Sequence, residues 1–194
     1  MSVAWSPKRS ARPPDHGFIQ VEDTPVTEPV KLCEFRLGDL YLAIDIRAVS
    51  EVLTQQAVRP VPLAPPAVRG LISIRGQVLA EIDLRTCLGL EPSPSGQRSK
   101  SIAIKSSCGP LCLLVDEVSD VIEMDPGQIE SAPEMLPPRL RLITTGVCFC
   151  QKRLILVVDE EQIIRLAIEG DSMARFTDDE LPQKGQTISD QIAR

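Results

Sequence analysis

The chain has 194 residues, of which 43% are hydrophobic and only 3% aromatic, enough to bury one large or two small cores built from Leu, Ile and Val. Its net charge of -6 and pI near 4.9 exclude a nucleic-acid surface, which requires clustered Lys and Arg or stacked aromatic rings. No apolar run approaches the roughly 18 residues of a membrane span or forms the core of a signal peptide, so we expect a cytoplasmic protein with no direct membrane insertion.

Residues 1–30 are rich in Pro, Ser and charge, and this composition predicts a disordered N-terminal arm. The folded part then begins with a hairpin. Apolar and polar residues alternate from Leu32 to Leu37, Gly38-Asp39 is a turn signal, and Tyr41 resumes a second strand.

A short helix is expected over residues 46–53. Ile46, Val49 and Leu53 fall at helical spacing, and Asp45 precedes them at an N-cap position. Residues 58–66 contain four prolines, which favours an extended crossing segment.

Residues 68–90 read "VRGLISIRGQVLAEIDLRTCLGL". The pattern predicts a strand, a turn at Arg75-Gly76 and a second, alternating strand, because Gly tolerates the positive φ that a tight turn needs. A helical turn follows, capped by Asp83 and ended by Gly89.

Beyond a loop at 91–99, apolar patterns predict strands within 100–105, 110–124, 141–150 and 153–159. Asp159 and Gln162 then predict a capped helix that stops at Gly170, and residues 169–194 form a polar C-terminal tail. The total of about nine strands and three short helices, in two successive sets of hairpins, predicts two small barrels or sandwiches.

No catalytic chemistry stands out. The only histidine, His16, lies in the predicted arm, and no phosphate-binding glycine motif occurs. The pairs Asp116-Glu117 and Glu160-Glu161 could form a catalytic carboxylate pair, but a strand end and the negatively charged first turn of a helix explain them more simply. We therefore predict no enzyme and no cofactor.

Six cysteines without an export signal are expected to be reduced thiols that behave as small hydrophobes. A cysteine-based zinc or redox protein is the alternative from a different class, with Cys108, Cys112, Cys148 and Cys150 as ligands. Neither pair has the C-x-x-C spacing usual in structural zinc sites, so no metal site is predicted.

The stretch at 68–90 resembles the signature of the CheW-like chemotaxis coupling proteins, in which a V-x-G-x-x-N-L-R-G turn precedes V-x-P-V-x-D-L-R and L-G-L. Three further stretches resemble the family in the same order: "FRLGDLYLAIDIRAVSEVL", "LLVDEVSDVIEM" and "RLILVVDEEQII". Together the matches define a CheW-like domain at residues 31–168.

The resemblance implies a mainly β fold of two SH3-like five-stranded β-barrels packed about a shared core, with a few short helices. It also implies a noncatalytic adaptor that couples the cytoplasmic tip of chemoreceptors to the regulatory domain of a CheA-type histidine kinase, and hence a location at membrane-proximal receptor arrays. Residue by residue, it assigns receptor binding to Val49, Gly70 and Arg75, and kinase binding to Glu51.

Two departures from the family pattern stand out. Ser73 replaces the usual Asn, and Ala80-Glu81 replace Pro and an apolar residue. If Glu81 lies at a partner surface, its replacement by Val is predicted to change partner preference more than stability. Together with the long terminal arms, the Ala80-Glu81 departure allows an alternative function, a scaffold for another chemosensory-like kinase system.

Overall fold

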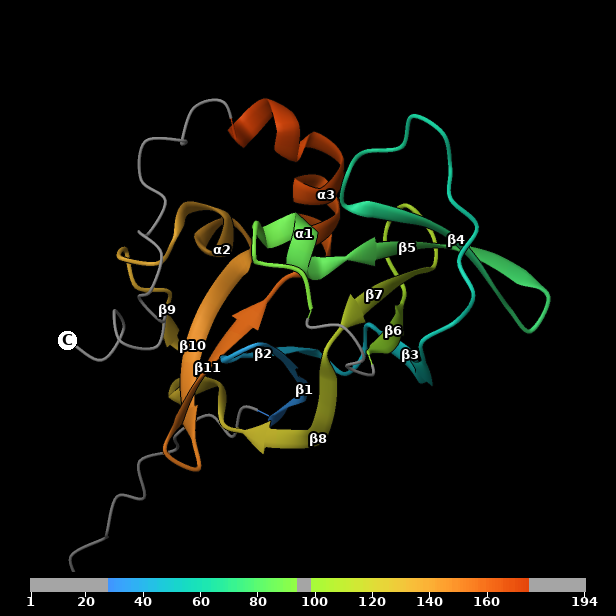
Figure 1. Ribbon diagram of the computed structural model, residues 1–194. Coiled ribbons are helices and arrows are strands. Elements are labelled where there is room, and N and C mark those ends of the chain that lie inside the picture. Colours follow the sequence, from blue (N-terminus) through green and yellow to red (C-terminus); the bar gives the residue numbers. More distant parts are fainter. Residues whose placement is uncertain (1–27, 94–98, 175–194) are drawn as a thin grey trace, which may run out of the picture.

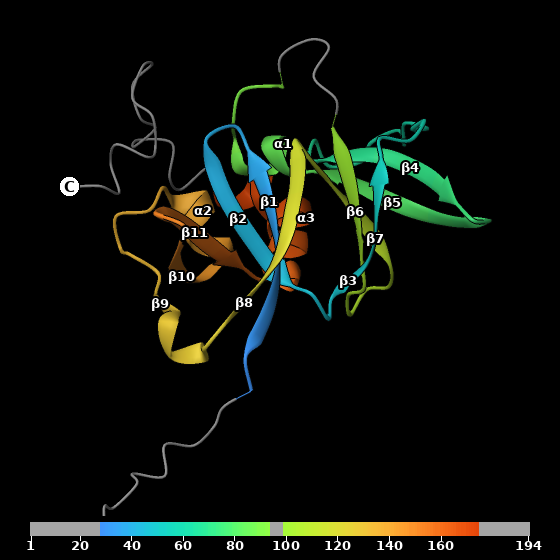
Figure 2. The same ribbon diagram turned by 90° about the horizontal axis from the view of Figure 1, so that it is seen from below.

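The computed structural model describes residues 28–93 and 99–174, with side chains up to Gly170. The predicted arm at 1–30 lies almost wholly outside these residues, and so does most of the tail predicted at 169–194. Two β-sheets lie side by side, and three α-helices cover the seam between them (Figures 1 and 2). No helix in the described ranges is long and apolar enough to cross a membrane.

The first sheet has six strands in the order β8-β1-β2-β11-β10-β9, which span Glu117–Met124, Val30–Leu37, Leu40–Asp45, Arg153–Val158, Thr144–Cys150 and Glu130–Ser131. The second sheet has five in the order β3-β6-β7-β5-β4, which span Val49–Thr54, Lys100–Ile104, Leu111–Val115, Gln77–Asp83 and Val68–Ile74. The helices are α1 (Leu84–Leu88), α2 (Pro138–Ile143) and α3 (Glu160–Ala174), and a 3₁₀ turn spans Pro126–Gln128.

The two sheets repeat one plan. Each contains two hairpins joined by a parallel contact, β2 with β11 in the first sheet and β7 with β5 in the second. In each sheet, an Asp at the end of a strand of the parallel pair, or directly after it, caps the following helix. Asp83 accepts the N–H groups of Arg85 and Thr86, and Asp159 accepts that of Gln162.

The mainly β fold with two strand sets and few helices is confirmed. The first set has six strands rather than the expected five, and no strand pair among the described residues closes either sheet into a barrel.

In the second sheet, a backbone bridge between Arg59 and Leu71 links the segment after β3 to β4. The chain enters the second sheet after β2 and returns at Asp116, between β7 and β8, so the second sheet is an insertion into the first.

A single apolar cluster fills the seam between the sheets. It contains Phe35 and Leu42 from the first sheet, Ile102 and Leu113 from the second, and Ile163 from α3. Because side chains of both sheets and a helix share this cluster, it is the common core of the two sheets. Each sheet also has a smaller apolar cluster of its own.

The helix predicted over 46–53 is wrong, because residues 49–54 form strand β3. Their burial alternates residue by residue, and β3 pairs with β6. Val49, Val52 and Thr54 are β-branched and favour a strand, so pairing outweighs the helical spacing. The predicted stop at Gly170 is also wrong, since α3 continues to Ala174.

Candidate functional site

The β4–β5 hairpin projects from the second sheet and turns at Arg75-Gly76 (Figure 1). Ile74 pairs with Gln77, so the loop has two residues, and φ is +50° at Arg75 and +83° at Gly76. Positive φ at both positions matches the twist of the flanking strands. The turn predicted from the sequence is confirmed, and its first residue is an arginine in a left-handed conformation.

Arg75 reaches across to the other edge of the sheet. Its Nη2 lies 2.8 Å from Oε2 of Glu51 on β3, and the two side chains are 82% and 25% exposed. Since β3 and β4 are the two edge strands of this sheet, the ion pair spans the opening between them. The structure thus joins the predicted receptor-binding arginine to the predicted kinase-binding glutamate.

A groove of about 260 Å³ lies beside this ion pair. Arg75, Glu51 and Gln77 form part of its rim, and Ile74 and Leu79 are among its nearly buried apolar residues. A guanidinium beside a groove of polar and apolar lining can hold a carboxylate or carbonyl while a side chain of the partner enters the groove.

The other two predicted site residues lie elsewhere. Val49 begins β3 and is half-buried against the shared core. Gly70 is buried in β4, five residues and therefore about 16 Å along the strand from Arg75. A Cβ at Gly70 would lie 2.4 Å from the Arg59 carbonyl oxygen, and φ there is +147°. Gly70 therefore permits the close bridge between Arg59 and the β4 strand.

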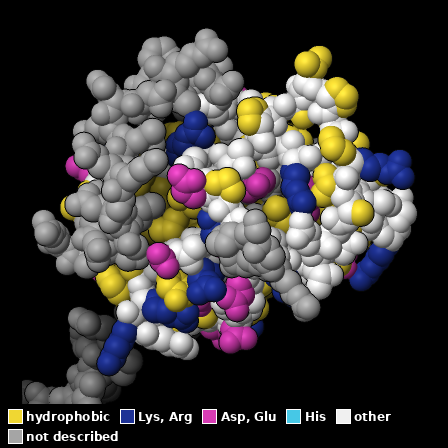
Figure 3. All heavy atoms as spheres, in the orientation of Figure 1, with side chains coloured by type: hydrophobic (Ala, Val, Ile, Leu, Met, Phe, Trp, Pro, Cys, Tyr) yellow, Lys and Arg dark blue, Asp and Glu magenta, His cyan; other side chains and the backbone are white. Residues whose placement is uncertain are grey.

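A second, larger groove of about 590 Å³ lies by the β3–β4 connection. Its lining includes Ser73, the first departure from the family pattern, together with Leu71, Val78 and Arg59. Leu71 and Val78 are exposed, as are Val61 and Leu63 in the connection. Figure 3 shows apolar side chains over this connection at the upper right of the molecule.

Glu81 does not lie at a partner surface. Its side chain is 0% exposed, and it accepts hydrogen bonds from Arg69 Nη1 at 2.8 Å and from Ser101 Oγ at 2.7 Å. The negative charge of Glu81 is therefore compensated by Arg69 within the second sheet. Arg69 is a residue of strand β4, and its guanidinium is paired with Glu81.

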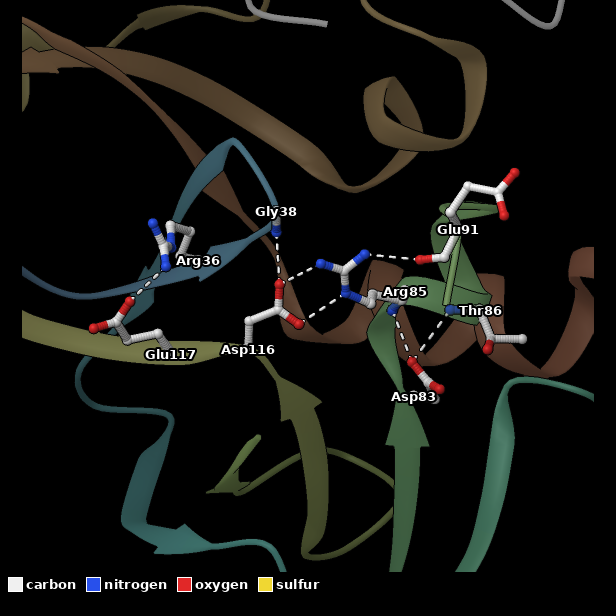
Figure 4. Close-up of polar contacts among 8 residues, drawn as sticks. All are labelled: Arg36, Gly38, Asp83, Arg85, Thr86, Glu91, Asp116 and Glu117. Atoms are coloured by element: carbon white, nitrogen blue, oxygen red, sulfur yellow. Dashed lines mark hydrogen bonds and ion pairs between the residues drawn. The ribbon is translucent and has the colours of Figure 1, made fainter. Parts of the chain in front are cut away.

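A further buried ion pair, which the sequence did not reveal, joins Arg85 to Asp116 (Figure 4). Asp116 also accepts the Gly38 N–H at 2.6 Å. Burial alone would raise the pKa of Asp116, but the Arg85 guanidinium and the Gly38 N–H outweigh it and hold the pKa below its usual value. Both residues stand in motifs that carry the family resemblance, D-L-R and V-D, but they lie 31 positions apart.

The Asp116 and Glu117 carboxylates have different ion-pair partners, whereas Glu160 and Glu161 both line one groove. The Glu117 carboxylate pairs with the Arg36 guanidinium on β1 at 2.9 Å, whereas the Asp116 carboxylate pairs with Arg85 (Figure 4). Glu161 accepts both the N–H and the hydroxyl of Ser107, and these bonds lower its pKa. These three carboxylates therefore hold structural contacts.

The cysteines are dispersed. Cys33, Cys87, Cys112 and Cys148 are buried, whereas Cys108 is exposed. Burial raises the pKa of Cys87 and of Cys112 to about 12. No group of three or more His, Cys, Asp or Glu side chains within the described ranges is placed to hold a metal ion.

Residues 31–167 match the family model described as the CheW-like domain. The chain belongs to this family. It is therefore a CheW-type scaffolding protein and not an enzyme, in agreement with the sequence resemblance.

Individual CheW proteins support this assignment. The chain is 30% identical over 133 residues to the chemotaxis protein CheW of Rhizobium meliloti, an alignment that covers 69% of this chain and 86% of that protein. For the Bacillus subtilis protein of the same name the identity is 28% over 134 residues, with the same coverage. The crystal structure of the scaffolding protein TtCheW from Thermoanaerobacter tengcongensis has a TM-score of 0.62 at 25% identity, over 68% of this chain and 89% of that one.

Proposed function

We propose that this chain bridges the cytoplasmic tip of chemoreceptors to the regulatory domain of a CheA-type histidine kinase, at receptor arrays in the cytoplasm. The observation that carries the proposal is the largely exposed Arg75 guanidinium, paired with the half-buried Glu51 beside a groove with polar and apolar lining, on a hairpin that projects from a CheW-like fold.

The site suits the tip of a helical receptor. Arg75 stands on a two-residue turn, which limits its backbone freedom, and its side chain is largely exposed. A guanidinium held this way can bind a carboxylate or a helix-end carbonyl with two hydrogen bonds. The adjacent groove of about 260 Å³, which has both polar and apolar lining residues, has room for a side chain from the same helix face.

The alternative of another chemosensory-like kinase system loses one of its two supports. It rested on the Ala80-Glu81 departure and on the long terminal arms. Glu81 is buried and paired within the protein, and most of the arms lies outside the described residues. The identity of the kinase recovered in the experiment below separates the two functions.

The test is a pull-down from cell extract with wild-type and Arg75→Ala protein, followed by titration of a receptor-tip fragment. We expect the wild type to recover a histidine kinase and receptors, and Arg75→Ala to lose about 1 to 3 kcal/mol of receptor affinity, with an unchanged melting temperature. Arg47→Ala is the matched control, because Arg47 is an equally exposed arginine paired with Asp45. Recovery of neither partner by the wild type would refute the proposal.

A further inference from the structure

A groove of about 600 Å³, separate from the Arg75–Glu51 site, lies where the chain enters the first sheet. Its apolar lining includes Val30 and Leu32 of β1, Val157 of β11 and Ala48, which precedes β3. The described part of the chain begins only two residues before Val30. Everything on the N-terminal side of residue 28 is therefore tethered directly beside this groove.

The groove also carries an excess of negative charge. It is lined by four acidic residues, Asp45, Asp159, Glu160 and Glu161, and by two basic residues, Arg47 and Lys105. Arg47 is paired with Asp45, so Lys105 stands alone against the other three carboxylates. The Glu160 side chain forms no hydrogen bond or ion pair within the described part of the chain, which leaves its carboxylate available to a cation.

The first 14 residues of the chain have the opposite character. They read "MSVAWSPKRSARPP", with Lys8, Arg9 and Arg12 and no Asp or Glu, in a chain whose net charge is -6. They also contain Trp5, the only tryptophan. A large ring with several basic side chains complements a groove that combines apolar walls with an excess of carboxylates.

The tether is long enough for this segment to reach the groove. Residues 15–29 connect the segment to Val30. A tether of this length spans up to about 50 Å when extended and about 20 Å on average as a coil. It holds the segment at an effective concentration in the millimolar range, so weak contacts are enough for docking.

We propose that residues 1–14 of the same chain occupy this groove, with Trp5 against the apolar walls and the basic side chains toward the carboxylates, above all that of Glu160. The groove is then filled from within the chain and is not a free surface for another protein. The inference does not depend on the proposed function, because every contact that it requires lies within one chain.

The test uses the full chain and its own tryptophan. Because Trp5 is the only tryptophan, fluorescence excited selectively at this ring reports on the N-terminal segment alone. Quenching by acrylamide measures how accessible the ring is. The first variant reverses the charge of the segment and combines Lys8→Glu, Arg9→Glu and Arg12→Glu.

Three further variants change the folded part of the chain. Glu160→Lys makes the groove less acidic, and Lys105→Glu makes it more acidic. Glu134→Lys is the matched control, because Glu134 is also an exposed carboxylate but does not line the groove. Circular dichroism verifies that each variant is folded before its quenching is compared with that of the wild type.

We expect acrylamide to quench Trp5 about threefold less effectively in the wild type than in the charge-reversed chain at low salt, and this difference to vanish near 1 M salt, where exposed charges are screened. Glu160→Lys should increase the quenching, Lys105→Glu should decrease it, and Glu134→Lys should leave it unchanged. Should Glu160→Lys fail to fold, Lys105→Glu decides, since its effect has the opposite sign.

Three results would overturn the inference. The first is equal quenching in the wild type and in the charge-reversed chain. The second is quenching that neither groove variant alters, because Trp5 would then be shielded elsewhere. The third is shielding that grows with protein concentration, because the occupant would then be the segment of a second copy.

Discussion

The Arg75 guanidinium lies 2.8 Å from the Glu51 carboxylate, so two residues that the family resemblance assigns to different partners share one ion pair. Each therefore influences the position of the other. Loss of Glu51 frees Arg75 to adopt many rotamers, and the order of that side chain must then be restored on binding.

A double-mutant cycle on Arg75→Ala and Glu51→Ala measures this coupling. We expect Glu51→Ala to weaken receptor-tip binding although it leaves the arginine in place, and the double variant to bind no more weakly than Arg75→Ala. The coupling free energy should be about 0.5 to 1 kcal/mol, because Arg75 is largely exposed. Strictly additive losses would show that the two residues act independently.

Gly70→Ala tests whether this glycine serves a partner or the fold. We expect a loss of more than about 2 kcal/mol in the free energy of unfolding, because the added Cβ would lie 2.4 Å from the Arg59 carbonyl oxygen and φ is +147°. Gly127→Ala is the control, since no atom lies within 4 Å of a Cβ there. Urea denaturation measures both. A stable Gly70→Ala protein with impaired receptor binding would restore the receptor role.

Local sequence signals predicted the hairpin at Arg75-Gly76 and the cap at Asp83 correctly. The turn and the cap each depend on residues only a few positions apart. Their geometry follows from φ preferences and from local hydrogen bonds between side chain and backbone, which the sequence predicts. The two sets of hairpins were predicted as successive along the chain, whereas the second sheet is inserted between β2 and β8 of the first, because strand pairing between distant positions is not visible in local patterns.

Contacts between distant positions explain what sequence reasoning missed. Arg69 and Ser101 are 12 and 20 positions from Glu81 in the sequence. The residues next to Glu81 therefore gave no sign that Arg69 and Ser101 would pair with its carboxylate. Asp116 was recognised as part of a family motif, but its partners come from α1 and from the β1–β2 turn. Strand β3 was misassigned for the same reason, since its pairing partner β6 lies about 50 residues later.

Glu81→Val is now expected to lower stability rather than to change partner preference. The substitution leaves the half-buried Arg69 without its carboxylate and removes the acceptor of the Ser101 hydroxyl. We expect a loss of about 1 to 3 kcal/mol in the free energy of unfolding, partly recovered by adding Arg69→Met. Glu123→Val, which breaks the exposed pair with Lys31, should have little effect. A stable Glu81→Val protein with altered partners would support the original expectation.

Thiol reactivity separates a scaffold from a cysteine-based protein. At pH 8 we expect Cys108 to react first with a thiol reagent, because it is the exposed cysteine, and Cys87 and Cys112 to remain inert, because burial raises their pKa to about 12. Cys108→Ser should abolish the fast phase. Rapid reaction of several thiols, or zinc that copurifies with the protein, would instead favour the metal or redox alternative.

The lowered pKa of Asp116 predicts how stability depends on pH. In the unfolded chain the carboxyl titrates near its ordinary value of about 3.9, whereas in the folded protein Arg85 and Gly38 keep it ionised at lower pH. The unfolded state therefore binds more protons in this range, and the stabilising contribution is complete above the unfolded pKa. This contribution is lost as the pH falls below about 4 toward the folded pKa.

Urea unfolding at pH values from about 3 to 6 measures this effect. We expect the wild type to lose more stability on acidification than Asp116→Asn, and Glu117→Gln to follow the wild type. Parallel curves for wild type and Asp116→Asn would mean that the ion pair does not stabilise the folded state through this carboxylate.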